Sequence, residues 1–156
     1  MMKIISHRGN YNGINTEREN KPSYIDTTIS MGYDVEVDIR FIEGKFYLGH
    51  DTPDTQINEE WILKRKEKIW FHCKDLYSAQ QFKKMNSGIK YFCHSYDDFV
   101  LTSTNHIWVH NLNLNLDNTC IIPLLNEESV KEHDYSQIVY AICTDHIDIL
   151  KNKIKN

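Results

Sequence analysis

Two carboxylates and a histidine lie close together in the segment 34–51, and their types and spacing suggest metal chemistry. Glu36 and Asp38 alternate with the apolar residues of a short run. Because residues i and i+2 of a strand share a face, both carboxylates are expected on one side of it. Like charges held so close raise each other's pKa unless a cation lies between them, and a hard divalent cation is the natural one. Gly44 then marks a turn, and a second short strand over 45–49 delivers His50.

The N-terminal run 3–7 is apolar and ends in His7, Arg8 and Gly9. We interpret it as a buried strand with polar residues at its C-terminal tip. Residues 10–15 form a loop rich in Asn and Gly, and Pro22 is suited to the first turn of a helix. A histidine and an arginine therefore precede the carboxylate strand by one crossover.

The rest of the chain continues to alternate short apolar strands with helices or loops. Further strands are expected at 68–73, 89–93, 107–109, 120–125 and 138–143. Helices are expected at 58–66, 75–88, 127–130 and 147–154, with a short helical turn beginning at 97–98 and loops over 51–56 and 111–116. Strands that alternate with helices are typically parallel.

Polar residues recur at the C-terminal ends of these strands: His7, Asp38, His72, His94, His110 and Asp145. In a β/α barrel that face carries the chemistry. We therefore expect an α/β fold, a compact, reduced TIM-type barrel of about seven to eight mostly parallel strands. Such barrels typically need about 250 residues. Several crossover helices must therefore be shortened in this chain of 156 residues, which we expect to form one domain over 1–156.

Composition narrows the classes of function. The chain is 40% hydrophobic and 26% charged, with a net charge of -4 and no basic block, which argues against a nucleic-acid polymer as partner. The N-terminal apolar run is too short for a signal peptide, and no stretch approaches membrane-spanning length. We expect buried, reduced thiols in a cytoplasmic protein, without a zinc site, at the four cysteines Cys73, Cys93, Cys120 and Cys143.

Several segments carry, in order, a resemblance to a known family. They are His7-Arg8-Gly9, Glu19-Asn20, the run from Gly32 to Asp38, Gly44, His50-Asp51 and the C-terminal Thr144-Asp145. The chain resembles the glycerophosphodiester phosphodiesterases, which share a superfamily with phosphatidylinositol-specific phospholipase C and the spider-venom sphingomyelinase D enzymes. The resemblance is strong over residues 3–51 and weak in the middle of the chain. It implies a β/α barrel that cleaves phosphodiesters with a divalent metal.

The resemblance also implies a role for each matching residue. His7 and His50 would be the acid–base pair, Arg8 would bind the phosphate, and Glu36 and Asp38 would bind the metal. Imidazoles with a pKa of about 6.5 can take up and release protons at neutral pH, and a metal with a guanidinium suits the anionic centre. The expected substrate is a small phosphodiester, either a glycerophosphodiester or one of lipid or nucleotide type. The expected metal is Mg²⁺ or Ca²⁺.

The third strand departs from the family pattern. Family members commonly carry there a Glu two residues before a Lys, and the Glu is a further metal ligand. Here Lys74 matches, as a substrate-binding residue, but His72 replaces the Glu. A neutral imidazole can still ligate a metal, but it removes one negative charge and softens the ligand set. We expect weaker binding of Mg²⁺ or Ca²⁺, or a preference shifted toward Mn²⁺, with His72 as a ligand or beside the ligands.

Other interpretations of single residues stay open. Arg8 could pair with Glu19 or Glu36 instead of a phosphate, and Lys74 could be a solvated residue at a strand end. His94 and His110 could line the pocket or be structural histidines with satisfied hydrogen bonds. Core positions are favoured over substrate stacking for the three tryptophans, Trp61, Trp70 and Trp108.

Two other functions are also open. A barrel that binds a phosphorylated ligand without turnover would fit the short chain and the replacement at His72, although such a binder needs no acid–base pair. A sphingomyelinase-D-like lyase would act on a phospholipid with a choline or ethanolamine head group. The absence of a recognisable signal peptide and of disulfides argues against the lyase.

Overall fold

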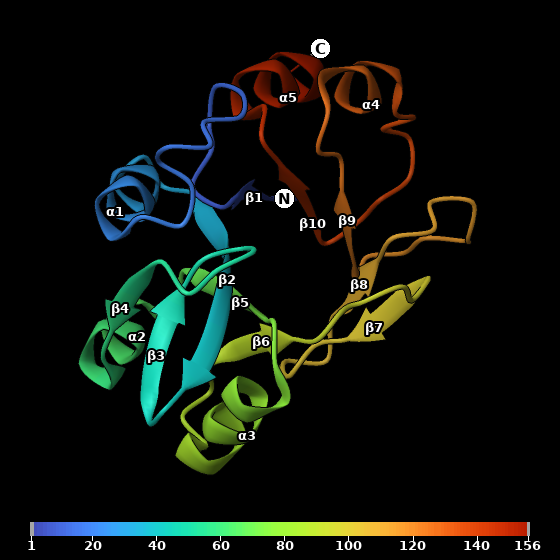
Figure 1. Ribbon diagram of the computed structural model, residues 1–156. Coiled ribbons are helices and arrows are strands. Elements are labelled where there is room, and N and C mark those ends of the chain that lie inside the picture. The colour runs from blue at the N-terminus through green and yellow to red at the C-terminus, as the bar shows by residue number, and fades with distance from the viewer. Residues whose placement is uncertain (1, 156) are drawn as a thin grey trace.

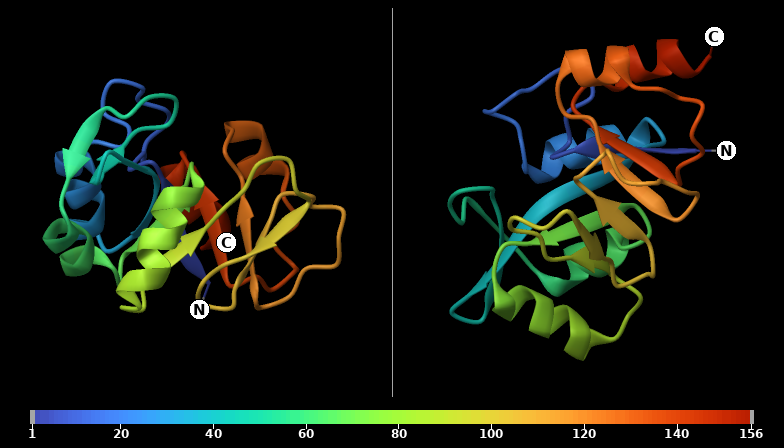
Figure 2. Two further views of the ribbon diagram at one scale, coloured as in Figure 1. Left: turned by 60° about the horizontal axis from the view of Figure 1, so that its bottom comes forward. Right: turned by 90° about the vertical axis from the view of Figure 1, so that its right-hand side faces the viewer.

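A computed structural model describes residues 2–155, so Met1 and Asn156, the two ends of the expected domain, lie outside the described residues. The fold is α/β, with a curled and mostly parallel sheet (Figure 1). Parallel ladders join neighbouring strands in the order β6 (Lys90–Phe92), β5 (Ile69–Cys73), β2 (Asp34–Ile42), β1 (Lys3–His7), β10 (Ala141–Thr144), β9 (Cys120–Pro123) and β8 (Ile107–Val109). The views in Figure 2 show these strands curving around a common interior.

Three further strands pair antiparallel at two places on this sheet. β3 (Lys45–Leu48) folds back on β2, and β4 (Thr55–Ile57) pairs with β3. Glu43 and Gly44 both have positive φ, 49° and 78°, which suits a tight hairpin turn. β7 (Phe99–Leu101) pairs with β8.

Two local expectations were wrong. The segment 51–56 was expected as a loop, but it includes the start of β4. Residues 97–98 were expected to begin a helical turn, but they lead into β7. Both strands are only three residues long, and pairing with a neighbouring strand stabilises them where the local sequence pattern is weak.

Helices fill only some of the connections between parallel strands. They are α1 (Pro22–Ser30), α2 (Glu59–Arg65), α3 (Leu76–Met85), α4 (Glu127–Glu132) and α5 (Ile147–Ile154). Asn58 and Asp75 cap α2 and α3 by accepting hydrogen bonds from the backbone N–H groups of Trp61 and Ser78. Within the described residues, no helix of the fold is both long and apolar enough to cross a bilayer.

The sheet has a seam between β6 and β8. Among residues 2–155 no backbone ladder joins these two strands, and no helix lies between β6 and β8 or between β8 and β9. A stack of the Phe92 and Trp108 rings, with centroids 4.2 Å apart, bridges the two strands instead. The expectation of shortened crossovers is confirmed, and the sheet forms a reduced barrel that is open at this seam.

The apolar side chains of β2 belong to one of several clusters that make up the core. Val35, Val37 and Ile39 are fully buried in a core that includes Phe82 of α3. A second core contains Trp70, Phe92 and Trp108 from the strands on both sides of the seam. Glu36 and Asp38 alternate with the first apolar set and are themselves buried.

The structure confirms the predicted burial of most cysteines and tryptophans. All four cysteines are free. Cys73, Cys120 and Cys143 are buried, but Cys93 is exposed because it follows the last residue of β6. Trp70 and Trp108 are buried, and Trp61 is partly buried against the core around β2.

Candidate functional site

The C-terminal ends of the parallel strands surround a cavity of about 610 Å³. Six of the seven expected site residues line it: His7, Arg8, Glu36, His50, His72 and Lys74. The seventh, Asp38, is fully buried beneath the cavity and contacts Arg8, His72 and Lys74. The remaining wall is made by side chains around the seam and on β9 and β10, among them Phe92, His94, Trp108, His110 and Leu125.

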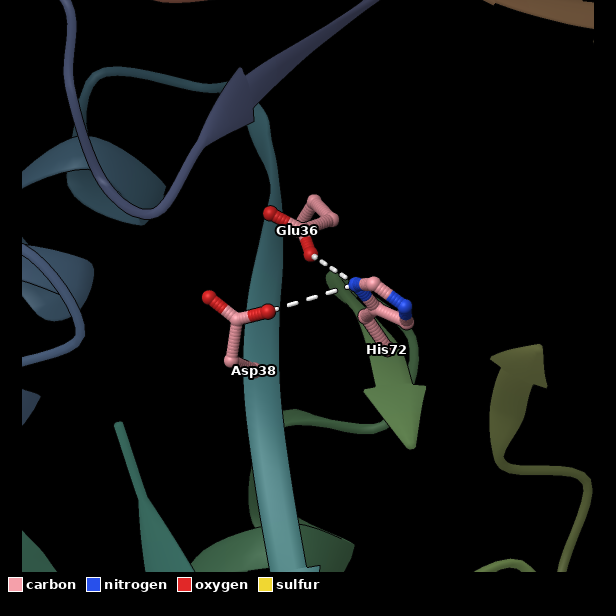
Figure 3. Close-up of side chains that lie close together, drawn as sticks. All are labelled: Glu36, Asp38 and His72. Atoms are coloured by element: carbon pink, nitrogen blue, oxygen red, sulfur yellow. Dashed lines mark ion pairs between the residues drawn. The ribbon is translucent and has the colours of Figure 1, made fainter. Parts of the chain in front are cut away.

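Glu36, Asp38 and His72 form a compact cluster (Figure 3). Asp38 and His72 are lateral neighbours in the β2–β5 ladder. The Nδ1 atom of His72 lies 3.2 Å from Oδ1 of Asp38 and 3.7 Å from Oε1 of Glu36. One ligand atom from each residue lies within 4.8 Å of the others, so a single ion could contact all three.

The ring orientation of His72 is compatible with a cation in this cluster. Its Nε2 atom lies 3.3 Å from the backbone oxygen of His94. A carbonyl oxygen only accepts, so Nε2 carries a hydrogen and Nδ1 faces the two carboxylates. If Nδ1 is unprotonated, its lone pair points at the carboxylate oxygens, and a cation between them would relieve the repulsion. If Nδ1 is protonated, the imidazolium is itself that cation.

The two carboxylates are suited to a cation because part of their bonding capacity is unused. Oε2 of Glu36 and Oδ1 of Asp38 are buried and accept no hydrogen bond from the described residues. Burial and the charge of Asp38 raise the pKa of Glu36. Burial would also raise the pKa of Asp38, but His72 and the Arg8 guanidinium hold it well below its usual range. A divalent ion would satisfy both oxygens and favour ionised Glu36.

Arg8 is held in place by two carboxylates. Its Nε atom lies 3.0 Å from Oδ2 of Asp38, and its Nη1 atom donates to Oε2 of Glu19 at 3.3 Å. The pairing with Glu19, left open by the sequence, is therefore present, whereas Glu36 is not a direct partner among the ion pairs of the described chain. Because Arg8 also lines the cavity, these contacts fix its guanidinium at the cavity wall.

Asn20 supports the same arrangement from the loop before α1. Its Nδ2 donates to Oδ2 of Asp38 at 3.0 Å, and its Oδ1 accepts from the backbone N–H of Asp38 at 3.0 Å. Its own N–H donates to the backbone oxygen of Arg8. Arg8 and Asn20 both have positive φ, 54° and 57°, an unfavourable conformation that surrounding contacts must hold. The motif Glu19-Asn20 thus orders the loop and also positions Arg8 and Asp38.

His7 is paired with a carboxylate from the last strand. Its Nδ1 donates to Oδ1 of Asp145 at 2.9 Å, and Asn10 donates to the same oxygen at 2.7 Å. Asp145 is 1% exposed. The Nε2 atom of His7 lies 3.9 Å from Oε2 of Glu36. Burial lowers the pKa of His7, but the hydrogen bond to Asp145 and the charges of Glu36 and Asp145 outweigh it, so the net shift is upward.

Asp145 is a site residue that was not among the expected ones. The sequence places it at the C-terminal end of a strand, where polar residues recur. It does not show that this strand lies beside β1, which brings Asp145 to a residue 138 positions earlier. The recurring polar positions at strand ends were the available signal.

His50 reaches the cavity from the loop after β3. Its side chain is 39% exposed, and its Nδ1 lies 2.7 Å from the exposed carboxylate of Asp51. Arg40 on β2 donates to the backbone oxygen of His50 and so holds the loop in position. Lys74, just after β5, lies 3.8 Å from Oδ1 of Asp38. The cavity therefore combines two carboxylate-paired imidazoles with the cluster, a guanidinium and an ammonium.

Comparison with known proteins supports the fold. The chain is similar to the crystal structure of a glycerophosphodiester phosphodiesterase from Agrobacterium tumefaciens, with a TM-score of 0.61 and 14% sequence identity over 97% of this chain and 100% of that chain. At this identity the likeness concerns the fold alone. No family model and no curated protein matches the sequence.

Proposed function

We propose that this chain is a metal-dependent phosphodiesterase that hydrolyses a small glycerophosphodiester-like substrate. The observation that carries the proposal is the meeting, at one cavity, of His7 and His50 with the Glu36–Asp38–His72 cluster. The fold shared with a glycerophosphodiester phosphodiesterase supports it. A pure binding protein would have no need of two imidazoles facing the space above a cation site.

Glu36, Asp38 and His72 would hold the divalent metal, Mg²⁺ or Ca²⁺, with Mn²⁺ as the ion that the imidazole favours. When bound, the metal supplies positive charge that stabilises the anionic phosphorane-like centre. Arg8, fixed by Asp38 and Glu19, and Lys74 add fixed positive charge beside that site. Together these residues would bind and orient the phosphate.

His7 and His50 would move the two protons of the reaction. One imidazole takes a proton from the attacking hydroxyl, and the other gives a proton to the departing oxygen. Asp145 fixes the tautomer of His7, because Nδ1–H donates to the carboxylate and leaves Nε2 for the cavity. Replacing either histidine would remove a proton-transfer step while leaving the Glu36–Asp38–His72 cluster intact.

The first prediction concerns these two histidines. With Mg²⁺, Ca²⁺ or Mn²⁺ present, the wild-type protein is expected to cleave bis(p-nitrophenyl) phosphate or glycerophosphodiesters. His7→Ala and His50→Ala are each expected to lower kcat by at least about a hundredfold. His133→Ala is the matched control, because His133 ends α4 and does not line the cavity. Product release is followed by absorbance or phosphorus NMR.

Two outcomes would contradict the proposal. One is the absence of cleavage of every phosphodiester tested with the three metals. The other is full activity of both alanine variants. A thermal shift caused by a phosphodiester without any product would support the binding-protein alternative.

A further inference from the structure

Two cysteines lie side by side on the outer face of the sheet, behind the cavity wall. Cys73 is the last residue of β5, and Cys93 directly follows β6. The ladder between these strands pairs His72 with Phe92, and both of these side chains line the cavity. Because successive side chains of a strand alternate between its faces, the cysteine that follows each of them points away from the cavity. The two cysteines are therefore the next neighbours in the same register.

The two thiols also share a surface depression. Its volume is about 360 Å³, and both cysteines line it. Cys93 is exposed, whereas Cys73 is 4% exposed. The Cys73 thiol donates a hydrogen bond to the sulfur of Cys93, which lowers the pKa of Cys93 to about 7. Cys93 is thus the accessible and more reactive thiol of the pair.

The backbone spacing at this pair suits a covalent bond between the sulfurs. Neighbouring strands lie about 4.7–4.9 Å apart, and the Cα atoms of a disulfide are usually about 4.4–6.8 Å apart. Cys93 lies just beyond the last residue of β6. Its backbone can therefore shift slightly and bring its sulfur to bonding distance without disturbing the ladder.

The other two cysteines do not form such a pair. The ladder between β9 and β10 sets Cys143 opposite Pro123, three positions along β9 from Cys120. Both thiols are buried, and they belong to different core clusters. Cys120 and Cys143 therefore serve as internal controls for any reaction of the first pair.

We propose that Cys73 and Cys93 are a modification site, a dithiol that low-molecular-weight disulfides such as oxidised glutathione convert reversibly into a disulfide. The Cys93 thiolate attacks one sulfur of the small disulfide and releases the other as a thiolate. The Cys73 sulfur gives its proton to solvent, attacks the Cys93 sulfur of this mixed disulfide and releases the second small thiolate. The protein thereby loses two electrons and two protons, and the small disulfide is reduced to two thiols.

The disulfide would tie the border of the seam to a strand of the cation cluster. His94 follows Cys93, and its ring stacks on that of His110 across the seam, with centroids 3.3 Å apart. On the other side, His72 directly precedes Cys73. Oxidation therefore fixes the end of β6 to β5 beside two cavity-lining histidines. The inference does not depend on the proposed function, because it concerns the reactivity of the two thiols.

The test follows the thiols of the full-length protein. Reduced protein is incubated with oxidised glutathione near neutral pH and then alkylated in denaturant, and its intact mass and its peptides are measured without reduction. Chymotrypsin suits the digestion, because Tyr96 and Phe99 separate Cys93 from Cys120. The expected product is a monomer that takes up two alkyl groups instead of the four of the reduced chain. It should contain linked peptides of Cys73 and Cys93 and should return to the dithiol with dithiothreitol.

Single variants test the order of the two steps. Cys73→Ala is expected to stop at the mixed disulfide, with glutathione on Cys93. Cys93→Ala is expected to take up glutathione at least about tenfold more slowly, because its remaining thiols are buried. Cys120→Ala should form the disulfide as the wild type does.

Two results with the wild type would overturn the inference. One is the uptake of four alkyl groups at every concentration of oxidised glutathione. The other is a disulfide that joins Cys93 to Cys120, to Cys143 or to a second chain. Both are read from the wild type alone, so the test holds even where alanine at buried Cys73 impairs folding. Neither result bears on phosphodiester cleavage by the reduced protein.

Discussion

At the scale of single residues, the Glu36–Asp38–His72 cluster differs at one position from the pattern of the family that the sequence resembles. In the glycerophosphodiester phosphodiesterases that the sequence resembles, a carboxylate commonly stands at the position of His72. The Nδ1 atom of His72 lies 3.7 Å from Oε1 of Glu36 and 3.2 Å from Oδ1 of Asp38. A neutral nitrogen ligand favours softer divalent ions than an all-oxygen set does. In the proposed metal site, this one side chain would therefore govern the choice of metal.

His72→Glu is expected to strengthen Mg²⁺ binding by on the order of tenfold, because affinity for hard cations rises with the number of charged oxygen ligands. The preference for Mn²⁺ over Mg²⁺ should fall at the same time. Titration of the metal-free protein with each ion measures both. His133→Glu adds the same charge away from the cavity and is expected to change neither affinity. Unchanged Mg²⁺ affinity in His72→Glu would show that residue 72 is not a ligand.

The second prediction at this scale concerns Asp145. Its hydrogen bond and charge help to raise the pKa of His7 against the opposing effect of burial. Asp145→Asn removes the charge but keeps a side chain of the same shape, so the pKa of His7 is expected to fall and the ring to lose its proton at a lower pH. NMR titration of the His7 ring in metal-free protein measures the shift. Asp51→Asn, beside exposed His50, should leave His7 unchanged, and an upward shift in Asp145→Asn would contradict the assignment.

At the scale of elements, β2 carries three acidic residues on one face, and they have two different surroundings. Glu36 lines the cavity and Asp38 is buried beneath it, while Asp34 lies at the N-terminal end of the strand. Asp34 is 5% exposed and accepts hydrogen bonds from Nε1 of Trp70 at 3.2 Å and Nζ of Lys90 at 3.3 Å. It therefore ties β2 to β5 and β6 below the cavity.

Asp34→Ala is expected to lower the free energy of unfolding by about 3 kcal/mol, because it leaves buried Lys90 and Trp70 without this partner. The value is at the low end for a broken buried pair, since Lys90 still donates to the backbone oxygen of Glu67. Urea denaturation measures the change. Asp26→Ala, which breaks an exposed pair with Arg65, is the control and should cost no more than about 1 kcal/mol. Equal losses in both variants would contradict the buried role of Asp34.

The sequence predicted the elements that have a strong local pattern. The alternation in β2, the turn at Gly44 and the caps at Asn58 and Asp75 are all encoded by neighbouring residues. The pairing of His7 with Asp145 and the stack of His94 on His110 join residues far apart in the chain, so no local pattern reveals them. β4 and β7 were missed for the same reason, because their partners in the sheet decide their conformation.

At the scale of the whole molecule, the sheet is continuous on one side and open on the other. β1, β2 and β10 are paired on both edges and largely buried, whereas β7 is an exposed edge strand beside the seam. Helices cover the sheet near β2 and β10, and a hairpin and a loop take their place near β8 (Figure 1). The stability of the fold is therefore concentrated away from the seam.

Hydrogen exchange followed by mass spectrometry is expected to reveal this asymmetry. Amides of β1, β2 and β10 should exchange on the order of a hundredfold more slowly than those of β7 and the loop 111–119, because local opening costs little where backbone groups are exposed. A peptide containing β7 with the same protection as β1 would contradict the expectation.

The seam has a consequence for how such a protein could change over evolution. The residues proposed for proton transfer and cation binding lie on or just after β1, β2, β3 and β5, which do not border the opening, while His94 and His110 sit on short connections that do. For the proposed phosphodiesterase, insertions or exchanges in the segments 94–98 and 110–119 would therefore alter which molecule is accepted without disturbing the residues proposed for cleavage. A library randomised only in these two segments would test whether the substrate range of the proposed phosphodiesterase can be changed in this way.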